Sequence, residues 1–290
     1  MKKNLNIFDI DYSKDIDAKN ITTMKVSARL KGVFYPKNQS ELIFLYNYLK
    51  INKLPFKILG NGSNVIFSKK AENLTILSTK KIKPKIYKRE NFLYANSSAS
   101  LSQIYRFCLQ NNLSGFESLA GIPATLGGAL YMNASAFGHQ IFDNLVSVKV
   151  LKNGRVVSIK KDKINFTYRN GGLSDCLILS AKFLLKTQDK CQIQNDFVKY
   201  MLLRGEKQPK GNCAGSIFKN PAYVSAGYLI DQCGLKGFEM NGAKFSNLHA
   251  NFIINNGDAS FADIQYLINL AYTKVYKKFK IKLEKEVELI

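Results

Sequence analysis

Ser118-Leu-Ala-Gly-Ile-Pro-Ala-Thr-Leu-Gly-Gly-Ala-Leu-Tyr-Met-Asn-Ala-Ser-Ala-Phe-Gly138 contains four glycines and five alanines but no charged side chain, in a chain with 43 lysines and arginines. Side chains this small allow main-chain N–H groups to approach a ligand, and successive N–H groups form a concavity that suits a phosphate or a carbonyl oxygen. Tight packing of a helix on a strand is the alternative explanation for such glycines. A second glycine loop upstream favours the ligand.

This second loop is Gly60-Asn61-Gly62-Ser63-Asn64. It lies between short apolar runs at 56–59 and 65–67, so the pattern predicts a loop between two strands. A dinucleotide-binding fingerprint would need a third glycine at the start of a helix, and a P-loop would end in Gly-Lys-Ser or Gly-Lys-Thr. Neither is present, so the loop either cradles a phosphate in another way or is a tight turn.

The composition is that of a globular protein. With 290 residues, of which 46% are hydrophobic, the chain has room for two or three packed units. No apolar run is long enough to span a bilayer, and the N-terminus lacks the apolar core of a secretion signal, so we expect a cytoplasmic protein. The five cysteines are scattered and only two histidines are present, so we expect reduced thiols and no metal site.

The formal charge of +22 has three possible explanations. The lysines are spread along the whole chain, and no arginine-rich tail or RNA-binding aromatic motif concentrates them. Lys, Asn and Ile are all abundant, as A+T-biased coding would produce. The other two explanations are a field that attracts polyanionic small molecules and an RNA-associated basic protein.

Several local patterns predict secondary structure. Asn153-Gly154 between two β-branched runs predicts a hairpin. Helices are predicted with Ser40, Ser100 and Ser260 as caps, the last in the capping-box sequence Ser-Phe-Ala-Asp. The alternation of apolar and charged residues over 281–290 predicts a final strand with one buried face.

Taken in order, several motifs resemble those of one enzyme family. They are Gly60–Asn64, Ala120-Gly-Ile-Pro123 with Gly127-Gly128, Tyr168-Arg169, Gly215-Ser-Ile-Phe-Lys-Asn-Pro221 and the terminal Leu283-x-x-Glu286-Val287. Together they resemble the UDP-N-acetylenolpyruvoylglucosamine reductases, flavoenzymes of bacterial cell-wall precursor synthesis, over nearly the whole chain. The chain length and the region 243–255 resemble the branch of this family that lacks an extra substrate-covering insertion.

The resemblance implies an α+β fold, in which two FAD-binding subdomains of the p-cresol-methylhydroxylase type precede a C-terminal α+β substrate-binding domain. The expected bounds are 1–80, 81–187 and 188–290. The loop 60–64 offers no His, Cys or Tyr for a covalent flavin link, so we expect dissociable FAD. The implied cofactor-binding residues are Gly60, Asn61, Gly62, Ser63, Asn64, Gly121, Ile122, Pro123, Gly127, Gly128, Asn133, Ala134 and Gly138.

The resemblance also implies a reaction. FAD would take a hydride from NADPH and pass it from N5 to UDP-N-acetylglucosamine enolpyruvate, giving UDP-N-acetylmuramate. Arg169 matches the family arginine that stabilises an enol-like intermediate together with a glutamate, Ser216 matches the proton donor, and Glu286 matches the glutamate. On the residues alone, Arg169 reads as a surface strand residue and Ser216 as a loop cap, and Glu284 or Glu288 suits the carboxylate role as well as Glu286.

The implied substrate contacts are Tyr168, Lys207, Lys219, Asn220 and His249, and lysines near these positions would attract the UDP diphosphate. We expect a monomer without nucleic-acid or membrane partners. A flavin oxidase of the same fold is the alternative enzyme class, and the 215–221 motif and the terminal glutamate argue against it.

Overall fold

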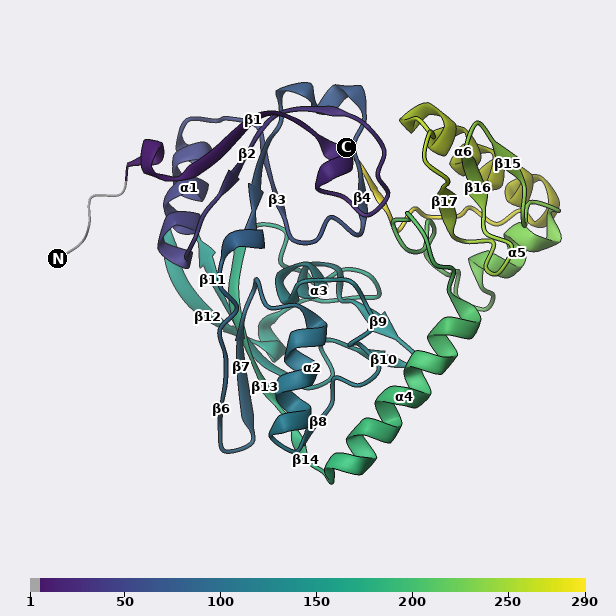
Figure 1. Cartoon of the computed structure of the whole chain (residues 1–290). Coiled ribbons are helices and arrows are strands. Elements are labelled where there is room, and N and C mark those ends of the chain that lie inside the picture. The colour runs from purple at the N-terminus through teal and green to yellow at the C-terminus, as the bar shows by residue number, and fades with distance from the viewer. Residues whose placement is uncertain (1–5) are drawn as a thin grey trace. The chain divides into compact units, whose positions relative to one another are not determined.

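The computed structural model describes residues 6–290, which form two compact units, each discontinuous in sequence (Figure 1). The first unit comprises the described residues up to Ser13, Gly32–Asn61 and Thr75–Leu203. The second comprises Lys14–Lys31, Gly62–Leu74 and Arg204–Ile290. The division into 1–80, 81–187 and 188–290 stays a prediction, because compactness alone does not identify a cofactor-binding or a substrate-binding domain.

Among residues 6–290, six α-helices carry most of the helical structure. They are α1 Gln39–Ile51, α2 Leu101–Gln110, α3 Leu126–Met132, α4 Lys190–Lys207, α5 Ala226–Gln232 and α6 Phe261–Phe279, with 3-10 turns at Ile7–Asp9, Ala18–Asn20, Lys69–Asn73, Thr79–Lys81 and Lys161–Lys163. Within residues 6–290, none of the helices combines the length and the apolar character needed to cross a membrane.

Two of the three predicted caps are confirmed. Ser100 and Ser260 both cap their helices through complete capping boxes. The prediction for α1 was wrong by two residues, because Asn38 is the cap and its side chain accepts from the Glu41 N–H. Asn38 has the extended backbone that a cap needs, with φ −152° and ψ 172°, whereas Ser40 already lies inside the helix.

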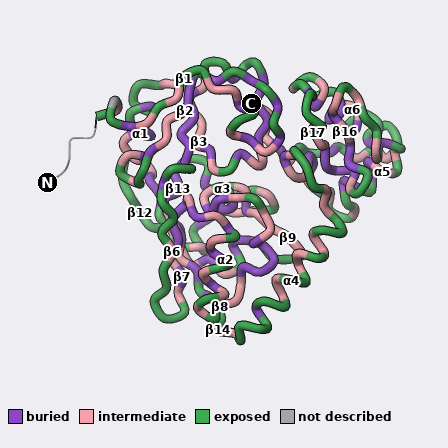
Figure 2. The backbone as a smooth tube through the Cα atoms, in the orientation of Figure 1, coloured by how far each residue is buried: buried purple, intermediate pink, exposed green. Residues whose placement is uncertain are grey.

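A five-stranded antiparallel sheet in the first unit has the order β12–β11–β13–β7–β6. Its strands are β6 Ile86–Arg89, β7 Phe92–Asn96, β11 Leu145–Lys152, β12 Arg155–Lys160 and β13 Leu177–Leu184. One face packs on α2 and α3 around a core that contains Phe142 and Phe183. The central strand β13 is largely buried and the edge strand β12 is exposed, as the purple and green of Figure 2 show.

The hairpin between β11 and β12 is as predicted. Its two turn residues, Asn153 and Gly154, have φ angles of 49° and 74°. Positive φ at both positions defines the type I′ turn, whose twist matches that of the strands and which Asn-Gly adopts readily.

A second sheet has the order β1–β2–β5–β3, and β2 and β3 both run parallel to β5. Its strands are β1 Asp11–Asp17, β2 Arg29–Tyr35, β3 Phe56–Leu59 and β5 Thr75–Ser78. Helix α1 connects β2 to β3 and buries Leu42, Leu45 and Leu49. Gly60 therefore follows the carboxyl end of a parallel strand, the end at which open α/β sheets bind ligands.

The first unit also contains two short strand pairs. β8, Leu113–Ser114, pairs with β14, Lys186–Thr187. β9, Ser135–Ala136, pairs with β10, His139–Gln140, and forms a small hairpin directly after α3.

The second unit packs α5 and α6 against a three-stranded antiparallel sheet of β15 Glu239–Met240, β16 Ala243–Phe245 and β17 Ile253–Asn255. Met24 and Ile66 belong to the same core. Two segments from the N-terminal part of the sequence are therefore needed to complete this unit.

The C-terminal residues 281–290 differ from the predicted strand. Only β18, Glu288–Leu289, has strand geometry, and it pairs in parallel with β4, Val65–Ile66. The predicted burial is correct, since Leu283 and Val287 are 5% and 3% exposed. Periodicity reports which side of a segment is buried but not where its backbone finds hydrogen-bond partners, so it could not reveal that the pairing is interrupted.

Candidate active site

Arg169 lies in a tight turn of the first unit. Thr167 and Asn170 exchange two backbone hydrogen bonds, of 2.8 and 3.1 Å, around Tyr168 and Arg169. Arg169 has a φ of 58°, at a turn position where glycine or asparagine is usual. A backbone of this kind costs about 1–3 kcal/mol for a bulky residue, so the fold holds an arginine here against its local preference.

The side chain of Arg169 is held as well. Its Nη1 donates to the Ser135 hydroxyl at 2.6 Å and to the Ser135 carbonyl at 3.3 Å. The guanidinium group also lies over the exposed ring of Tyr168, 5.1 Å from the ring centre. A planar cation fixed in this way can hold a carboxylate in a single orientation.

Gly171 docks this turn on α3. Its N–H donates to the carbonyl of Tyr131 at 2.9 Å, and a Cβ at this position would lie 1.8 Å from the carbonyl oxygen of Leu130. Because the obstacle is backbone rather than a flexible side chain, only glycine allows the turn to approach the helix this closely.

We expect Gly171→Ala to lower the free energy of unfolding by about 2 kcal/mol or more, since the added methyl group overlaps a carbonyl oxygen. Gly205→Ala is the matched control, because Gly205 lies in α4 with open space around it. Alanine there should raise the free energy of unfolding by up to about 1 kcal/mol. Urea unfolding midpoints measure both effects, and an unchanged midpoint for Gly171→Ala would contradict the close contact.

The glycines of the expected cofactor segments serve two purposes. At Gly60 and Gly127 an added Cβ would approach neighbouring side chains to 2.3 and 3.0 Å. At Gly128 it would meet nothing closer than 3.6 Å, and at Gly138 nothing within 4 Å. Tight packing therefore explains the first two glycines, whereas the last two leave backbone exposed to open space.

The two glycine segments meet within the first unit. The Asn61 side chain donates from Nδ2 to the carbonyl of Pro123 at 3.2 Å. Gly121 and Ile122 precede this proline in the same turn, and Ala134 lies just before β9. The Gly127 N–H donates to Ser97 and the Gly128 N–H to the Thr125 hydroxyl, so these N–H groups already have partners in the fold.

Asn133 is the most buried polar residue of the expected cofactor set, at 2% exposure. Its Nδ2 donates to the carbonyl of Thr167 at 3.0 Å and to Gln140 Oε1 at 2.9 Å. Its Oδ1 is a buried acceptor with no hydrogen-bond partner in the described part of the chain. A flavin nucleotide carries a ring N–H group, which needs an acceptor, and a diphosphate, which needs uncharged backbone that it can approach closely. The Asn133 oxygen and the exposed backbone at Gly128 and Gly138 fit these two requirements.

Ser216 lies half-buried in the second unit, in an antiparallel bridge with Phe252. The residues that follow it are fixed by Asn251, which is 1% exposed. Asn251 Oδ1 accepts from the Phe218 N–H at 3.0 Å, and its Nδ2 donates to the Phe218 carbonyl at 2.8 Å. Sequence reasoning missed Asn251, because an amide in an apolar strand pattern gives no sign of the distant loop to which it binds.

Glu286 lies beside the Ser216 segment. Its N–H donates to the carbonyl of Ile217 at 2.8 Å, and its own carbonyl accepts from Asn64 Nδ2 at 3.1 Å. The structure thus brings the backbone of Glu286 next to the residue that follows Ser216. Glu286 is also joined to the second part of the Gly60–Asn64 loop, in which Gly62 has a φ of 65° and Ser63 is half-buried.

The alternative carboxylates have different surroundings. Glu284 has a 75% exposed side chain and forms an ion pair with Lys219 at 3.1 Å. The Glu288 N–H donates to the carbonyl of Asn64 at 3.0 Å within the β4–β18 pairing. Among the three glutamates, Glu286 is the one whose backbone is hydrogen-bonded to Ile217, the residue directly after Ser216, whereas the Glu284 carbonyl accepts from the Lys219 N–H at 2.8 Å.

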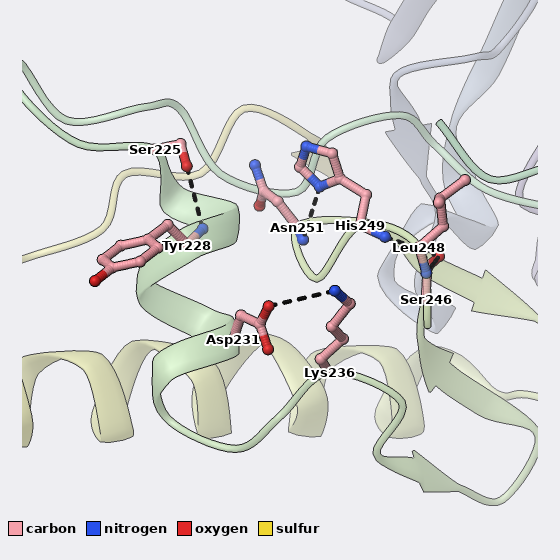
Figure 3. A network of polar contacts seen from close by, with 8 residues as sticks. All are labelled: Ser225, Tyr228, Asp231, Lys236, Ser246, Leu248, His249 and Asn251. Atoms are coloured by element: carbon pink, nitrogen blue, oxygen red, sulfur yellow. Dashed lines mark hydrogen bonds and ion pairs between the residues drawn. The ribbon is translucent and has the colours of Figure 1, made fainter. Parts of the chain in front are cut away.

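His249 is half-buried beside α5, close to Asn251 (Figure 3). Its Nδ1 accepts from the Asn251 N–H at 3.2 Å, and a Cβ on Gly227 of α5 would lie 2.8 Å from its Cε1. Burial lowers the pKa of His249 below the ordinary value of 6.5, so the ring is neutral at pH 7 and carries its proton on Nε2. It can donate a hydrogen bond but supplies no fixed positive charge.

The remaining expected substrate residues are divided between the two units. Asn220 Oδ1 accepts from the N–H of Ala226 at 3.0 Å, which anchors the start of α5. Lys207 is the exposed last residue of α4. Tyr168 lies with Arg169 in the first unit, whereas Ser216 and Glu286 lie in the second.

Comparison with known proteins identifies the family. Residues 207–290 match the model described as the C-terminal domain of UDP-N-acetylenolpyruvoylglucosamine reductase. The chain is 38% identical, over 291 residues, to the reductase of that name from Caldicellulosiruptor bescii, covering 97% of this chain and 91% of that protein. The chain belongs to the UDP-N-acetylenolpyruvoylglucosamine reductase family. A second relative, from Aquifex aeolicus, is 36% identical over 96% of this chain and 95% of its own length.

The fold comparison agrees. The crystal structure of UDP-N-acetylenolpyruvylglucosamine reductase from Thermus caldophilus superposes with a TM-score of 0.80 at 28% identity, covering 97% of this chain and 98% of that one. Residues 30–160, which contain both glycine segments, match an FAD binding domain. The predicted α+β fold with an FAD-binding part is confirmed. So is the predicted enzyme class, an FAD-containing oxidoreductase of peptidoglycan precursor synthesis.

Proposed function

We propose that this protein reduces UDP-N-acetylglucosamine enolpyruvate to UDP-N-acetylmuramate with NADPH, through non-covalently bound FAD. The observation that best supports this is the hydrogen bond between the backbones of Glu286 and Ile217. It places a carboxylate residue beside the segment that carries the Ser216 hydroxyl, and this reaction needs such groups to supply and control a proton.

The proposed roles follow from the chemistry of the enolpyruvyl ether. Bound FAD would supply the hydride, accepted from NADPH and delivered from N5 to the enolpyruvyl methylene. Negative charge then develops toward the substrate carboxylate, which the Arg169 guanidinium would stabilise. Ser216 would donate a proton to the adjacent carbon, and Glu286 would assist Arg169 in stabilising the enol-like intermediate.

The serine is an unusual acid, so its position matters more than its intrinsic pKa. Asn251 holds the backbone of the Ser216–Phe218 segment through both of its side-chain atoms. Lys219, the next residue after this segment, forms an ion pair with Glu284. These contacts hold the backbone next to Ser216, which supports the proposed role of its hydroxyl.

For the substrate we propose contacts from Tyr168, Lys207, Lys219, Asn220 and His249. Lys207 and Lys219 would interact with the diphosphate through charge, whereas the neutral His249 would donate a hydrogen bond. The bare backbone at Gly128 and Gly138 and the buried oxygen of Asn133 would contribute to FAD binding. A monomeric cytoplasmic state stays a prediction.

The test begins with the purified protein, which should be yellow and release FAD on denaturation. Under anaerobic conditions, NADPH should bleach the flavin absorbance, and the enolpyruvyl sugar nucleotide should restore it. UDP-N-acetylglucosamine, which lacks the enolpyruvyl group, is the matched control and should leave the flavin bleached. The proposal would be contradicted if the protein could not be loaded with FAD. It would also be contradicted if oxygen reoxidised the reduced flavin but the enolpyruvyl sugar nucleotide did not.

A further inference from the structure

The Arg169 turn is strained, and its own residues do not explain how it is held. The positive φ of Arg169 is disfavoured locally, and its two turn hydrogen bonds run only between Thr167 and Asn170. A strained turn keeps its conformation only when contacts from the surrounding structure hold it in place. The contacts that do so come from α3, on which Gly171 docks, and from the segment immediately after it.

Ser135 is the residue that reaches the functional group itself. Both its hydroxyl and its carbonyl accept hydrogen bonds from Arg169 Nη1, at 2.6 and 3.3 Å. A guanidinium has five N–H donors in a rigid plane, so fixing Nη1 at two points determines where the other donors are directed. The hydroxyl makes the shorter of the two contacts.

The position of Ser135 is set independently of Arg169. Ser135 begins the β9–β10 hairpin, and the tip of this hairpin contacts α4. There, Phe137 stacks on Tyr200 with ring centres 5.5 Å apart, and His139 Nε2 lies 3.2 Å from the Tyr200 hydroxyl. The serine hydroxyl is therefore presented by a hairpin whose tip is held against α4.

Asn133 supplies the second attachment. It ends α3 with a φ of 45°, and its side chain bridges the carbonyl of Thr167 and Gln140 Oε1. It thus ties the base of the Arg169 turn to β10, the partner strand of β9. The β9–β10 hairpin and Asn133 therefore hold both the Arg169 turn and its guanidinium group.

We infer that Ser135 is a positioning residue for the reductase: its hydroxyl orients the Arg169 guanidinium toward the carboxylate of the substrate. This inference rests on the proposed function for the identity of the carboxylate, but the contact between Ser135 and Arg169 does not. Ser135→Ala removes the hydroxyl and keeps the carbonyl contact, so the arginine loses its orientation while the turn remains.

The first test is kinetic. Ser135→Ala should lower kcat/KM for the enolpyruvyl sugar nucleotide roughly 10-fold, the effect of one hydrogen bond to a charged group. FAD content and the rate of flavin reduction by NADPH should not change. Ser135→Thr retains a hydroxyl in a strand position that suits threonine and should recover most of the loss. Equal loss in Ala and Thr variants would overturn the inference.

The second test is a double-mutant cycle with Arg169→Ala. If Ser135 acts through Arg169, Ser135→Ala should have no further effect on kcat/KM once the arginine is gone. Urea midpoints of the same four proteins give a readout independent of turnover, and the two substitutions should again be non-additive. Additive effects in both cycles would overturn the inference.

The two proposals can fail separately. If Arg169→Ala leaves reoxidation by the enolpyruvyl sugar nucleotide unchanged, the role of Arg169 in the proposed function is wrong, and the orienting role of Ser135 falls with it. If Arg169→Ala slows reoxidation but Ser135→Ala does not, the proposed function stands and the role of Ser135 is overturned.

Discussion

Ser216→Ala is expected to slow reoxidation of the reduced flavin by the enolpyruvyl sugar nucleotide about 100- to 10,000-fold, the range associated with loss of a positioned general acid. Hydride transfer to the enolpyruvyl methylene is still possible in this variant, but the adjacent carbon of the substrate receives no proton from residue 216. Flavin reduction by NADPH needs no proton from this residue, so its rate should stay near that of the wild type. Stopped-flow absorbance under anaerobic conditions measures the two half-reactions separately.

A control is needed because any substitution in the second unit can destabilise it. Ser260→Ala removes the cap of α6 and should cost about 1 kcal/mol of stability without changing either half-reaction. Ser216 occupies an extended segment whose hydrogen bonds are made by the main chain and by Asn251, so alanine should preserve the fold. If Ser216→Ala impairs both half-reactions equally, the hydroxyl supports the fold or the flavin rather than proton transfer.

Glu286→Gln is expected to slow the same half-reaction about 100- to 1,000-fold, comparable to the loss of one group that stabilises developing charge. Glutamine has nearly the same shape and keeps the backbone bonds to Ile217 and Asn64. Glutamine removes, however, the carboxyl group that would assist Arg169 in stabilising the enol-like intermediate. Stopped-flow reoxidation again gives the rate.

Glu288→Gln is the matched control for this prediction. It lies two residues further on in β18, and its N–H donates to the carbonyl of Asn64 rather than to Ile217. We expect its reoxidation rate to stay within about threefold of the wild type, as for a charge change outside the reacting groups. A larger loss in Glu288→Gln than in Glu286→Gln would show that the wrong carboxylate has been assigned.

The sequence was informative where a feature is produced by neighbouring residues. Asn153-Gly154 adopts positive φ at both positions, and Ser100 and Ser260 form their capping boxes, as their local patterns predict. The family motifs were equally clear, because each is a short run in fixed order. The prediction of the α1 cap was wrong because Asn38 and Ser40 are both residue types that cap helices, and residue type alone does not choose between them.

Only part of the candidate site could be predicted from local sequence. Arg169, Ser216 and Glu286 were predicted from motifs. No motif marks Ser135 or Asn251, whose proposed roles depend on hydrogen bonds to residues 34 and 33 positions away in the chain. Small residues and polar strand residues are too common for such partners to be found without coordinates.

The sequence by itself determined the β11–β12 hairpin, two of the three predicted helix caps, the two glycine segments and the residues expected to do the chemistry, because local propensity and short motifs depend on adjacent residues. Only the tertiary structure decided which glycines pack and which expose backbone, which glutamate adjoins Ser216, and what holds the strained Arg169 turn. These depend on contacts between distant segments, and such contacts exist only once chain entropy has been overcome by the packing of the whole unit.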